Sequence, residues 1–200
     1  TAASPGGAGK STVLADLLGL LPPGHEIVTI TDPRVVDDAA TPCCLAHEIG
    51  AGHWYGYIWG RDVQRFFALM GHGTRTASCI HADSLEEMQS LLLAPPLSVP
   101  EDHFHKLDLI LFIHVNRRRE RRVAALYEAS ANGSGHRLAF HWDPEGDVII
   151  RDGQSELFTR LGTDEADYHN RLAAVNRIVH EGDENFEFVR AKVLDVYGSS

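Results

Sequence analysis

The feature that most constrains the fold of this chain is a short run near its start, Ser4 to Thr12, which reads SPGGAGKST. Apart from Ser4 at the first glycine position, the run has the spacing G-x-x-x-x-G-K-[ST]. Small residues in such a loop let backbone N–H groups turn inward around phosphate oxygens. Because a helix-forming run follows, the phosphates would also lie at a helix N-terminus. The run therefore predicts a phosphate-binding loop. The alternative is a glycine-rich surface loop before a helix.

The side chains of the loop have distinct expected roles. Lys10 is expected to reach the β- and γ-phosphates of a nucleotide, and the Ser11 hydroxyl is expected to ligate Mg²⁺. The predicted cofactors are therefore ATP and Mg²⁺. The predicted contacts to the nucleotide are Ser4, Gly6, Gly7, Ala8, Gly9, Lys10, Ser11 and Thr12.

The charge balance limits the class of partner. The formal net charge is −10, and only three of the 18 basic residues are lysines, which leaves fifteen arginines. An acidic surface argues against nucleic acid as a partner, because nucleic-acid binding needs basic patches. Two explanations of the arginine bias stay open: a salt-rich cytoplasm, or a GC-rich genome.

The compartment follows from the cysteines and from the apolar runs. The three cysteines lack C-x-x-C spacing. This pattern is simplest to explain if the cysteines are reduced and the protein is cytoplasmic. No apolar run reaches the length of a membrane span, and no signal peptide is evident. We therefore expect a cytoplasmic protein that reaches a membrane only through a partner.

The periodicity of the chain predicts an α/β fold. Residues 34–53 have little pattern and are predicted to be irregular. A phosphate loop normally follows a buried strand, so we expect the first strand to be largely missing at the N-terminus. The predicted division is a nucleotide-binding domain over 1–150 and a helical appendage over 151–200. Strands are predicted over 26–30, 55–59, 76–80, 107–115, 121–130 and 137–142, and helices over 12–21, 61–70, 85–93, 155–162, 164–181 and 185–197. This order predicts a mainly parallel sheet with an antiparallel extension and a small C-terminal helical tail.

Several motifs beyond the loop occur in a specific order. They read EIVTITDP, then GH before a strand that ends in IHADS, then APPLSVP, LDLILFIHV and FHWDPEGD. This series resembles the type II/type IV secretion ATPases, in particular the archaeal branch that assembles pili and archaella. The resemblance implies a RecA-like P-loop NTPase domain that hydrolyses ATP. It also implies a homohexameric ring on the cytosolic face of the membrane, acting on a polytopic membrane platform protein.

The resemblance also assigns site residues. The ITDP motif matches the family's Asp box, so Asp32 is expected to hold Mg²⁺ through water. His72 and His81 match the His box, which is thought to sense the γ-phosphate. The resemblance thus implies four catalytic residues: Lys10, Asp32, His72 and His81.

Two departures from the family pattern bear on activity. Thr31 precedes Asp32, where the family has a glutamate. The strand predicted over 55–59 ends at Gly60 without the glutamate that polarises the attacking water in the family. Two interpretations stay open: a working motor with a displaced carboxylate, or a degenerate paralogue that binds nucleotide as a non-catalytic assembly subunit. The candidates for the displaced carboxylate are Asp32, Asp62 and Glu48.

An arginine-rich run over 117–122 invites a claim of nucleic-acid binding. A solvated hairpin with arginines on its outer face fits the acidic total better. One of these arginines is a candidate for contact with a neighbouring subunit, and the sequence does not single one out.

Overall fold

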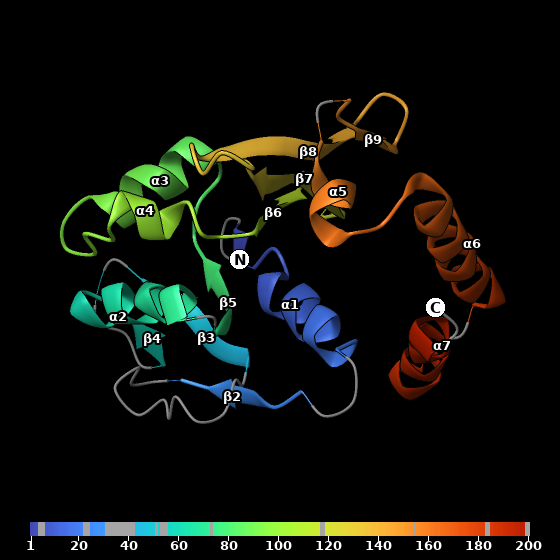
Figure 1. Ribbon diagram of the computed structural model, residues 1–200, viewed down its shortest axis with the longest axis horizontal. Helices are drawn as coiled ribbons and strands as arrows, with labels where there is room; N and C mark the ends of the chain where they lie inside the picture. Colours follow the sequence, from blue (N-terminus) through green and yellow to red (C-terminus); the bar gives the residue numbers. More distant parts are fainter. Residues whose placement is uncertain are drawn as a thin grey trace.

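The computed structural model of the chain describes residues 1–3, 7–21, 25–30, 43–50, 52, 56–72, 74–116, 119–153, 155–182 and 185–198. Among the predicted site residues, Ser4, Gly6 and Asp32 lie outside these ranges, and His72 is described only in its backbone. The described elements form a central sheet with helices beside it and a helical tail at one side (Figure 1).

The strands of the described residues join in a single sheet with the order β2-β3-β5-β1-β6-β7-β8-β9, and β4 pairs with β3. The strands from β2 to β6 run parallel to their neighbours, and those from β6 to β9 run antiparallel. The parallel strands are β1 (Ala2–Ala3), β2 (Ile27–Thr29), β3 (Cys43–Ile49), β4 (Tyr57–Ile58), β5 (Arg75–Ile80) and β6 (Leu109–Val115), and the antiparallel ones are β7 (Arg121–Ala129), β8 (His136–Asp143) and β9 (Val148–Arg151). The predicted α/β fold, with its mainly parallel sheet and antiparallel extension, is confirmed.

The helices cover the sheet as the direction of each connection requires. Helix α1 (Lys10–Gly19) contacts β1 and β5, and lies on the opposite side of these strands from α2 (Arg61–Leu69), α3 (Leu85–Leu93) and α4 (Glu101–Phe104) (Figure 1). Right-handed crossovers explain this arrangement, because the chain moves away from β1 after α1 and back toward it after α2. The central strands β1 and β5, which have helices on both sides, are mostly buried.

Large apolar side chains fill the space between the sheet and the helices α2 to α4. Helix α2 presents Val63, Phe66 and Phe67 to this core on one face, as its predicted helical spacing requires. The rest of the core includes Ile49, Ile58, Ile80, Met88, Leu92, Leu97, Phe104 and Ile110. The core therefore lies against β1, β3 and β5.

One secondary-structure prediction is wrong in a way that matters for the site. Residues 43–49, predicted to be irregular, form β3 between β2 and β5 in the sheet. Of the strand predicted over 55–59, the described residues Tyr57 and Ile58 form β4, which pairs with the end of β3. One face of the segment CCLAHEI is buried throughout, and on the other face His47 is the exposed residue. The segment therefore lacks the polar–apolar alternation by which a half-buried strand is recognised.

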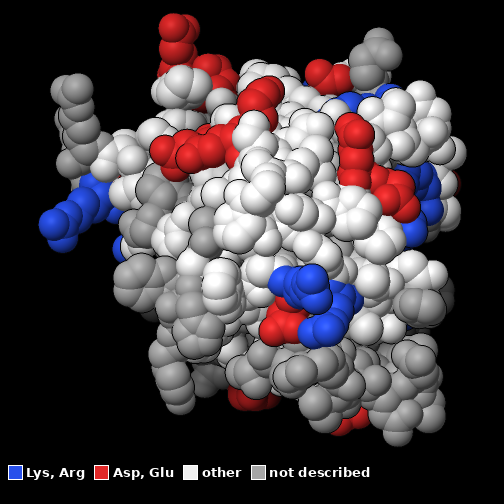
Figure 2. All heavy atoms as spheres, turned by 90° about the vertical axis from the view of Figure 1, so that its left-hand side faces the viewer, with Lys and Arg blue, Asp and Glu red and all other residues white. Residues whose placement is uncertain are grey.

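The charged residues of the surface are spread out. Figure 2 shows the left-hand side of Figure 1, where acidic side chains lie in several separate groups and a broad central area is uncharged. Basic side chains lie at a few separate places on this face. Among the residues that the structure describes, no helix is both long and apolar enough to cross a bilayer.

The helical tail returns to α1. It consists of α5 (Leu157–Leu161), α6 (Glu165–Glu181) and α7 (Phe186–Gly198), close to the predicted helices. The Arg190 Nε donates a hydrogen bond to the Gly19 carbonyl at 2.7 Å, at the C-terminus of α1. The ring of Phe186 occupies the space that a Cβ at Gly19 would need, with the nearest ring atom 2.3 Å from that position. The absence of a side chain at Gly19 therefore permits this contact.

Helix α3 begins with the predicted Ser84 cap, and Glu87 reaches back to Asp83, the residue before the cap, which supplies a stability test. The Ser84 Oγ accepts from the Glu87 N–H at 3.1 Å, and the Glu87 Oε2 accepts from the Asp83 N–H at 2.7 Å. Ser84→Ala is expected to lower the free energy of unfolding by about 1 kcal/mol, because one N–H of the first turn loses its acceptor. Ser84→Asp should restore most of this loss in urea denaturation. Equal losses in the two variants would show that capping is not the cause.

Candidate functional site

Three neighbouring parallel strands end at the same edge of the sheet, and each carries a polar residue there. Strand β5 lies between β1 and β3. Lys10 follows β1 across the glycine-rich loop, His81 directly follows β5, and Glu48 is the penultimate residue of β3. Because carboxyl ends of parallel strands meet at one edge of an open sheet, ligand sites form there. The topology therefore brings together three residues that are far apart in the sequence.

The three side chains form a compact triangle. The Lys10 Nζ lies 3.3 Å from the His81 Nδ1 and 4.0 Å from the Glu48 Oε2. The His81 Nε2 lies 3.7 Å from the Glu48 Oε1. Lys10 and Glu48 are only 4% and 8% exposed, whereas the His81 side chain is 46% exposed. A buried lysine–carboxylate pair thus lies beneath an accessible imidazole.

The loop before α1 has the conformation that its glycines allow. Gly7 and Gly9 have φ angles of 79° and 91°, in the left-handed region that disfavours other residues. Gly9 is the N-cap of α1, and the first turn of the helix contains no acidic residue. Ala8 is buried, and Lys10 is the first residue of α1. The N-terminus of α1 is therefore suited to hold an anion.

The carboxylate of Glu48 is poised to accept a proton or hydrogen bond. Burial raises the pKa of Glu48, while the neighbouring Lys10 and His81 act in the opposite direction. Within the described residues, its buried Oε1 accepts no hydrogen bond. A buried oxygen without a donor is costly in the absence of a ligand. It is therefore a suitable acceptor for a water molecule, free or held by a metal ion, at the mouth of the loop.

The elevated pKa of Glu48 has a consequence for stability. A folded state that raises the pKa of an acid binds its proton more tightly than the unfolded state does. Stability therefore falls as pH rises from the ordinary glutamate range through the folded pKa, and the loss persists at neutral pH. We therefore expect the melting temperature of Glu48→Gln, relative to that of the wild type, to rise between about pH 4.5 and about pH 7. Glu145→Gln, at an exposed position, is the control. A difference that does not vary with pH would contradict this account.

The other residues predicted for the site fall into three groups. Ser11 and Thr12 lie in the first turn of α1, at exposed positions next to Lys10. His72 ends the 3₁₀ helix at Met70–His72, and nothing is described of its side chain. Asp32 lies outside the described residues.

The structure changes which carboxylate is the candidate for water activation. Asp62, at the start of α2, pairs with Arg65 at 2.8 Å on the exposed side of that helix. Glu48, which sequence reasoning gave only as one possible substitute, is the carboxylate that lies beside Lys10. Strand β3, and not β4, is the neighbour of β5 in the sheet. The sequence signal that could have singled out Glu48 is its place as a glutamate at the end of a mostly apolar run.

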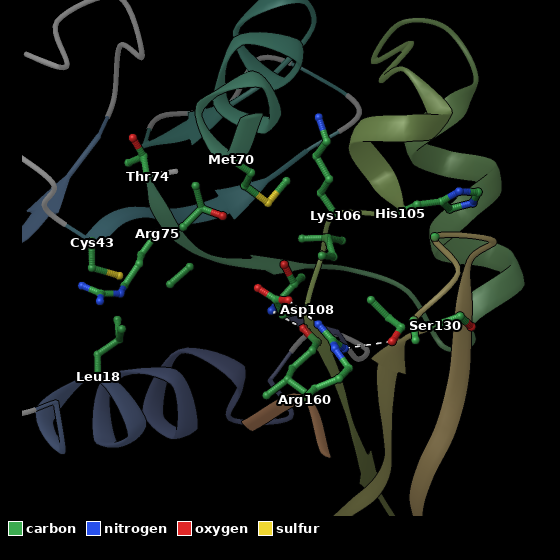
Figure 3. Close-up of a pocket in the computed structure, with 18 of the residues that line it drawn as sticks. Leu18, Cys43, Met70, Thr74, Arg75, His105, Lys106, Asp108, Ser130 and Arg160 are labelled. Atoms are coloured by element: carbon green, nitrogen blue, oxygen red, sulfur yellow. Dashed lines mark hydrogen bonds and ion pairs between the residues drawn. The ribbon is translucent and has the colours of Figure 1, made fainter. Parts of the chain in front are cut away.

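A cavity of about 690 Å³ lies at the other end of the strands. It is lined by the first residues of β3, β5 and β6 and by Thr1, which precedes β1, and includes none of the residues of the glycine-rich loop among those described. Figure 3 shows Arg160 turned toward Asp108 at its margin, where it pairs at 2.6 Å. This cavity is therefore separate from the triangle of Lys10, Glu48 and His81.

Comparison with known proteins adds little. No protein-family model matches the chain, and no curated protein matches its sequence. Among solved structures, the chain is similar to the VirB11 ATPase from the Brucella suis type IV secretion system, crystallised with sulphate, at 16% identity and a TM-score of 0.41. The match covers 76% of this chain and 47% of that one, so the chain spans about half of that structure. The fold and the candidate site are therefore inferred from the geometry of this chain alone.

Proposed function

We propose that this chain is the ATP-binding and ATP-hydrolysing motor domain of a type II/type IV secretion or archaeal pilus or archaellum machine. The observation that carries the proposal is the triangle of Lys10, Glu48 and His81 at the ends of three adjacent parallel strands. It joins a phosphate loop to a buried carboxylate, which are the two halves of a site for phosphoryl transfer to water.

The phosphate half of the site would hold the nucleotide. Backbone N–H groups from Gly7 to Lys10 and the N-terminus of α1 would surround the phosphates, and the Lys10 ammonium would neutralise the β- and γ-phosphate charge. The Ser11 hydroxyl would ligate Mg²⁺, which supplies charge stabilisation when bound. The unsatisfied Glu48 Oε1 fits this ligand set, because Mg²⁺ in nucleotide sites commonly keeps water molecules that carboxylates accept from.

The carboxylate half would act on water. Glu48 would orient a water molecule for in-line attack on the γ-phosphorus and accept its proton as the new P–O bond forms. The bond from phosphorus to the β–γ bridging oxygen breaks, and the products are ADP and phosphate. The raised pKa of Glu48 makes it a stronger base than an exposed glutamate. His81 would report on the γ-phosphate, since its imidazole lies between Lys10 and solvent.

The finer parts of the proposal rest on the sequence motifs. The IHADS, PPLSVP and WDPE segments support the homohexameric ring, the membrane platform partner and the assembly of pilin-like subunits. The roles of Asp32 as a water-mediated Mg²⁺ ligand and of His72 as a phosphate sensor have the same support. The division into a motor domain over 1–150 and an appendage over 151–200 has the same support.

A second candidate function is a non-catalytic nucleotide-binding subunit of such a machine. The substitutions at Ser4 and Thr31, two motif positions, favour it. It predicts nucleotide binding through Lys10 without turnover.

Two measurements on the same preparation separate these functions. We expect MgATP to raise the melting temperature, since a ligand at about 100 times its Kd stabilises by about 2.7 kcal/mol. We also expect the rate of phosphate release per protein molecule to rise with protein concentration, because ring formation completes such sites. Both are measured across a salt series that includes high salt. Stabilisation without phosphate release would establish the second candidate. No stabilisation and no release would refute nucleotide function altogether.

A further inference from the structure

The hairpin of β6 and β7 places one arginine beside the phosphate loop. Strand β6 pairs with β1 in parallel, with Phe112 opposite Ala3. The residues of β6 beyond Phe112 therefore continue alongside the loop that follows β1. Strand β7 returns from this end, with Arg121 opposite Val115. The register of the hairpin thus fixes Arg121 at the loop.

The contact between Arg121 and the loop is direct. The Arg121 Nη2 donates to the Gly7 carbonyl at 3.4 Å. The Arg121 Cδ and Nε lie 3.4 Å and 3.5 Å from the position that a Cβ on Gly9 would take. The guanidinium is therefore held against the two residues on either side of Ala8, and the residue remains exposed.

The neighbouring arginine has a different role. Arg122 forms a two-pronged pair with Asp147, with distances of 3.0 Å and 3.2 Å, and Asp147 also accepts from the Trp142 Nε1 at 2.9 Å. This network anchors the hairpin to the next turn. Within the described part of the chain, the guanidinium of Arg121 has the long hydrogen bond to a neutral carbonyl and no carboxylate partner. The residue is exposed at the loop.

We propose that Arg121 binds the β- or γ-phosphate of the nucleotide, as a second cation beside Lys10 from the same chain. This inference rests on the proposed nucleotide function. A phosphate oxygen is a stronger acceptor than the Gly7 carbonyl, and the guanidinium fork can donate two hydrogen bonds to it. The side chain then exchanges the carbonyl for phosphate when the loop fills. Within the described part of the run over 117–122, Arg121 contacts the loop of its own chain, and Arg122 pairs with Asp147.

The test measures MgATP and AMP affinity for the wild type, Arg121→Ala, Arg121→Lys and Arg177→Ala. Arg177 is an exposed arginine on α6 and serves as the matched control. We expect Arg121→Ala to weaken MgATP binding about tenfold to a hundredfold, the effect of a lost charge-assisted hydrogen bond, with little change for AMP. Arg121→Lys should lie between it and the wild type, because it keeps the charge and loses the fork. The loss of MgATP affinity in Arg121→Ala should become smaller as the salt concentration increases.

Two results would overturn the inference. One is equal MgATP affinity for Arg121→Ala and the wild type. The other is an equal, salt-independent loss for MgATP and AMP together with a lower melting temperature of the free protein, which would make Arg121 a structural brace for the loop. Failure of the proposed function is distinguishable from both, because the wild type would then not bind MgATP.

Discussion

Replacing Glu48 with Gln is expected to slow ATP hydrolysis by about a hundredfold or more, the usual contribution of a general base, while MgATP binding is retained. The amide keeps the shape of the side chain and loses the basic oxygen that accepts the proton from water. Binding should be equal to that of the wild type or tighter, because Lys10 is released from the ion pair with Glu48. Single-turnover phosphate release and MgATP titration of the same protein measure the two effects.

Glu145→Gln supplies the matched control for this variant. It makes the same chemical change at an exposed residue of the turn between β8 and β9, and it should leave turnover unchanged. Undiminished hydrolysis by Glu48→Gln would remove Glu48 from the chemistry. A parallel loss of binding and hydrolysis would mean that Glu48 shapes the loop and does not act on water.

Replacing Lys10 with Ala is expected to weaken MgATP binding about a hundredfold or more and to remove turnover, since a charged contact to phosphate is lost in a buried site. The variant also leaves the buried Glu48 carboxylate without its lysine, and breaking a buried pair by removing one partner is strongly destabilising. We therefore expect a lower melting temperature in the absence of nucleotide. Lys106→Ala, at the opposite end of the strands, should change neither property.

The double variant Lys10→Ala with Glu48→Gln separates the two effects. It removes the unpaired carboxylate, so the melting temperature should return toward that of the wild type. Nucleotide binding should remain lost, because the phosphate charge still lacks its partner. If the double variant is as unstable as Lys10→Ala, the ion pair is not the source of the instability. If it binds MgATP as the wild type does, Lys10 is not a phosphate ligand.

Local features of the sequence were enough to predict the loop and most of the helices. The Gly-Lys-Ser-Thr run marks the start of α1, although the helix begins at Lys10 and not at residue 12. The pair of Ser84 and Glu87 marks the start of α3, and Gly162 and Gly182 follow the ends of α5 and α6 in the left-handed conformation. These signals act within a few residues, so they can be read without the tertiary structure.

The candidate site could not be predicted from local sequence, because contacts between distant segments form it. Strand β3 has cysteine, alanine and histidine where a strand usually carries β-branched residues, and its pairing with β2 and β5 stabilises it. Only that pairing shows that Glu48, and not Asp62, reaches Lys10. In the same way, the register of β6 with β7 places Arg121 opposite Val115 and its neighbour Arg122 opposite His114, and Arg121 contacts the loop. Long-range pairing of this kind has no local signature.

The most direct test of the account is a crystal structure of the chain with Mg²⁺ and a non-hydrolysable ATP analogue. The account predicts the β- and γ-phosphates within hydrogen-bond distance of the Lys10 Nζ, and Glu48 within reach of the γ-phosphorus through one water molecule. An analogue bound in the cavity beside Asp108 and Arg160, or phosphates at the loop with Glu48 turned away from them, would contradict it.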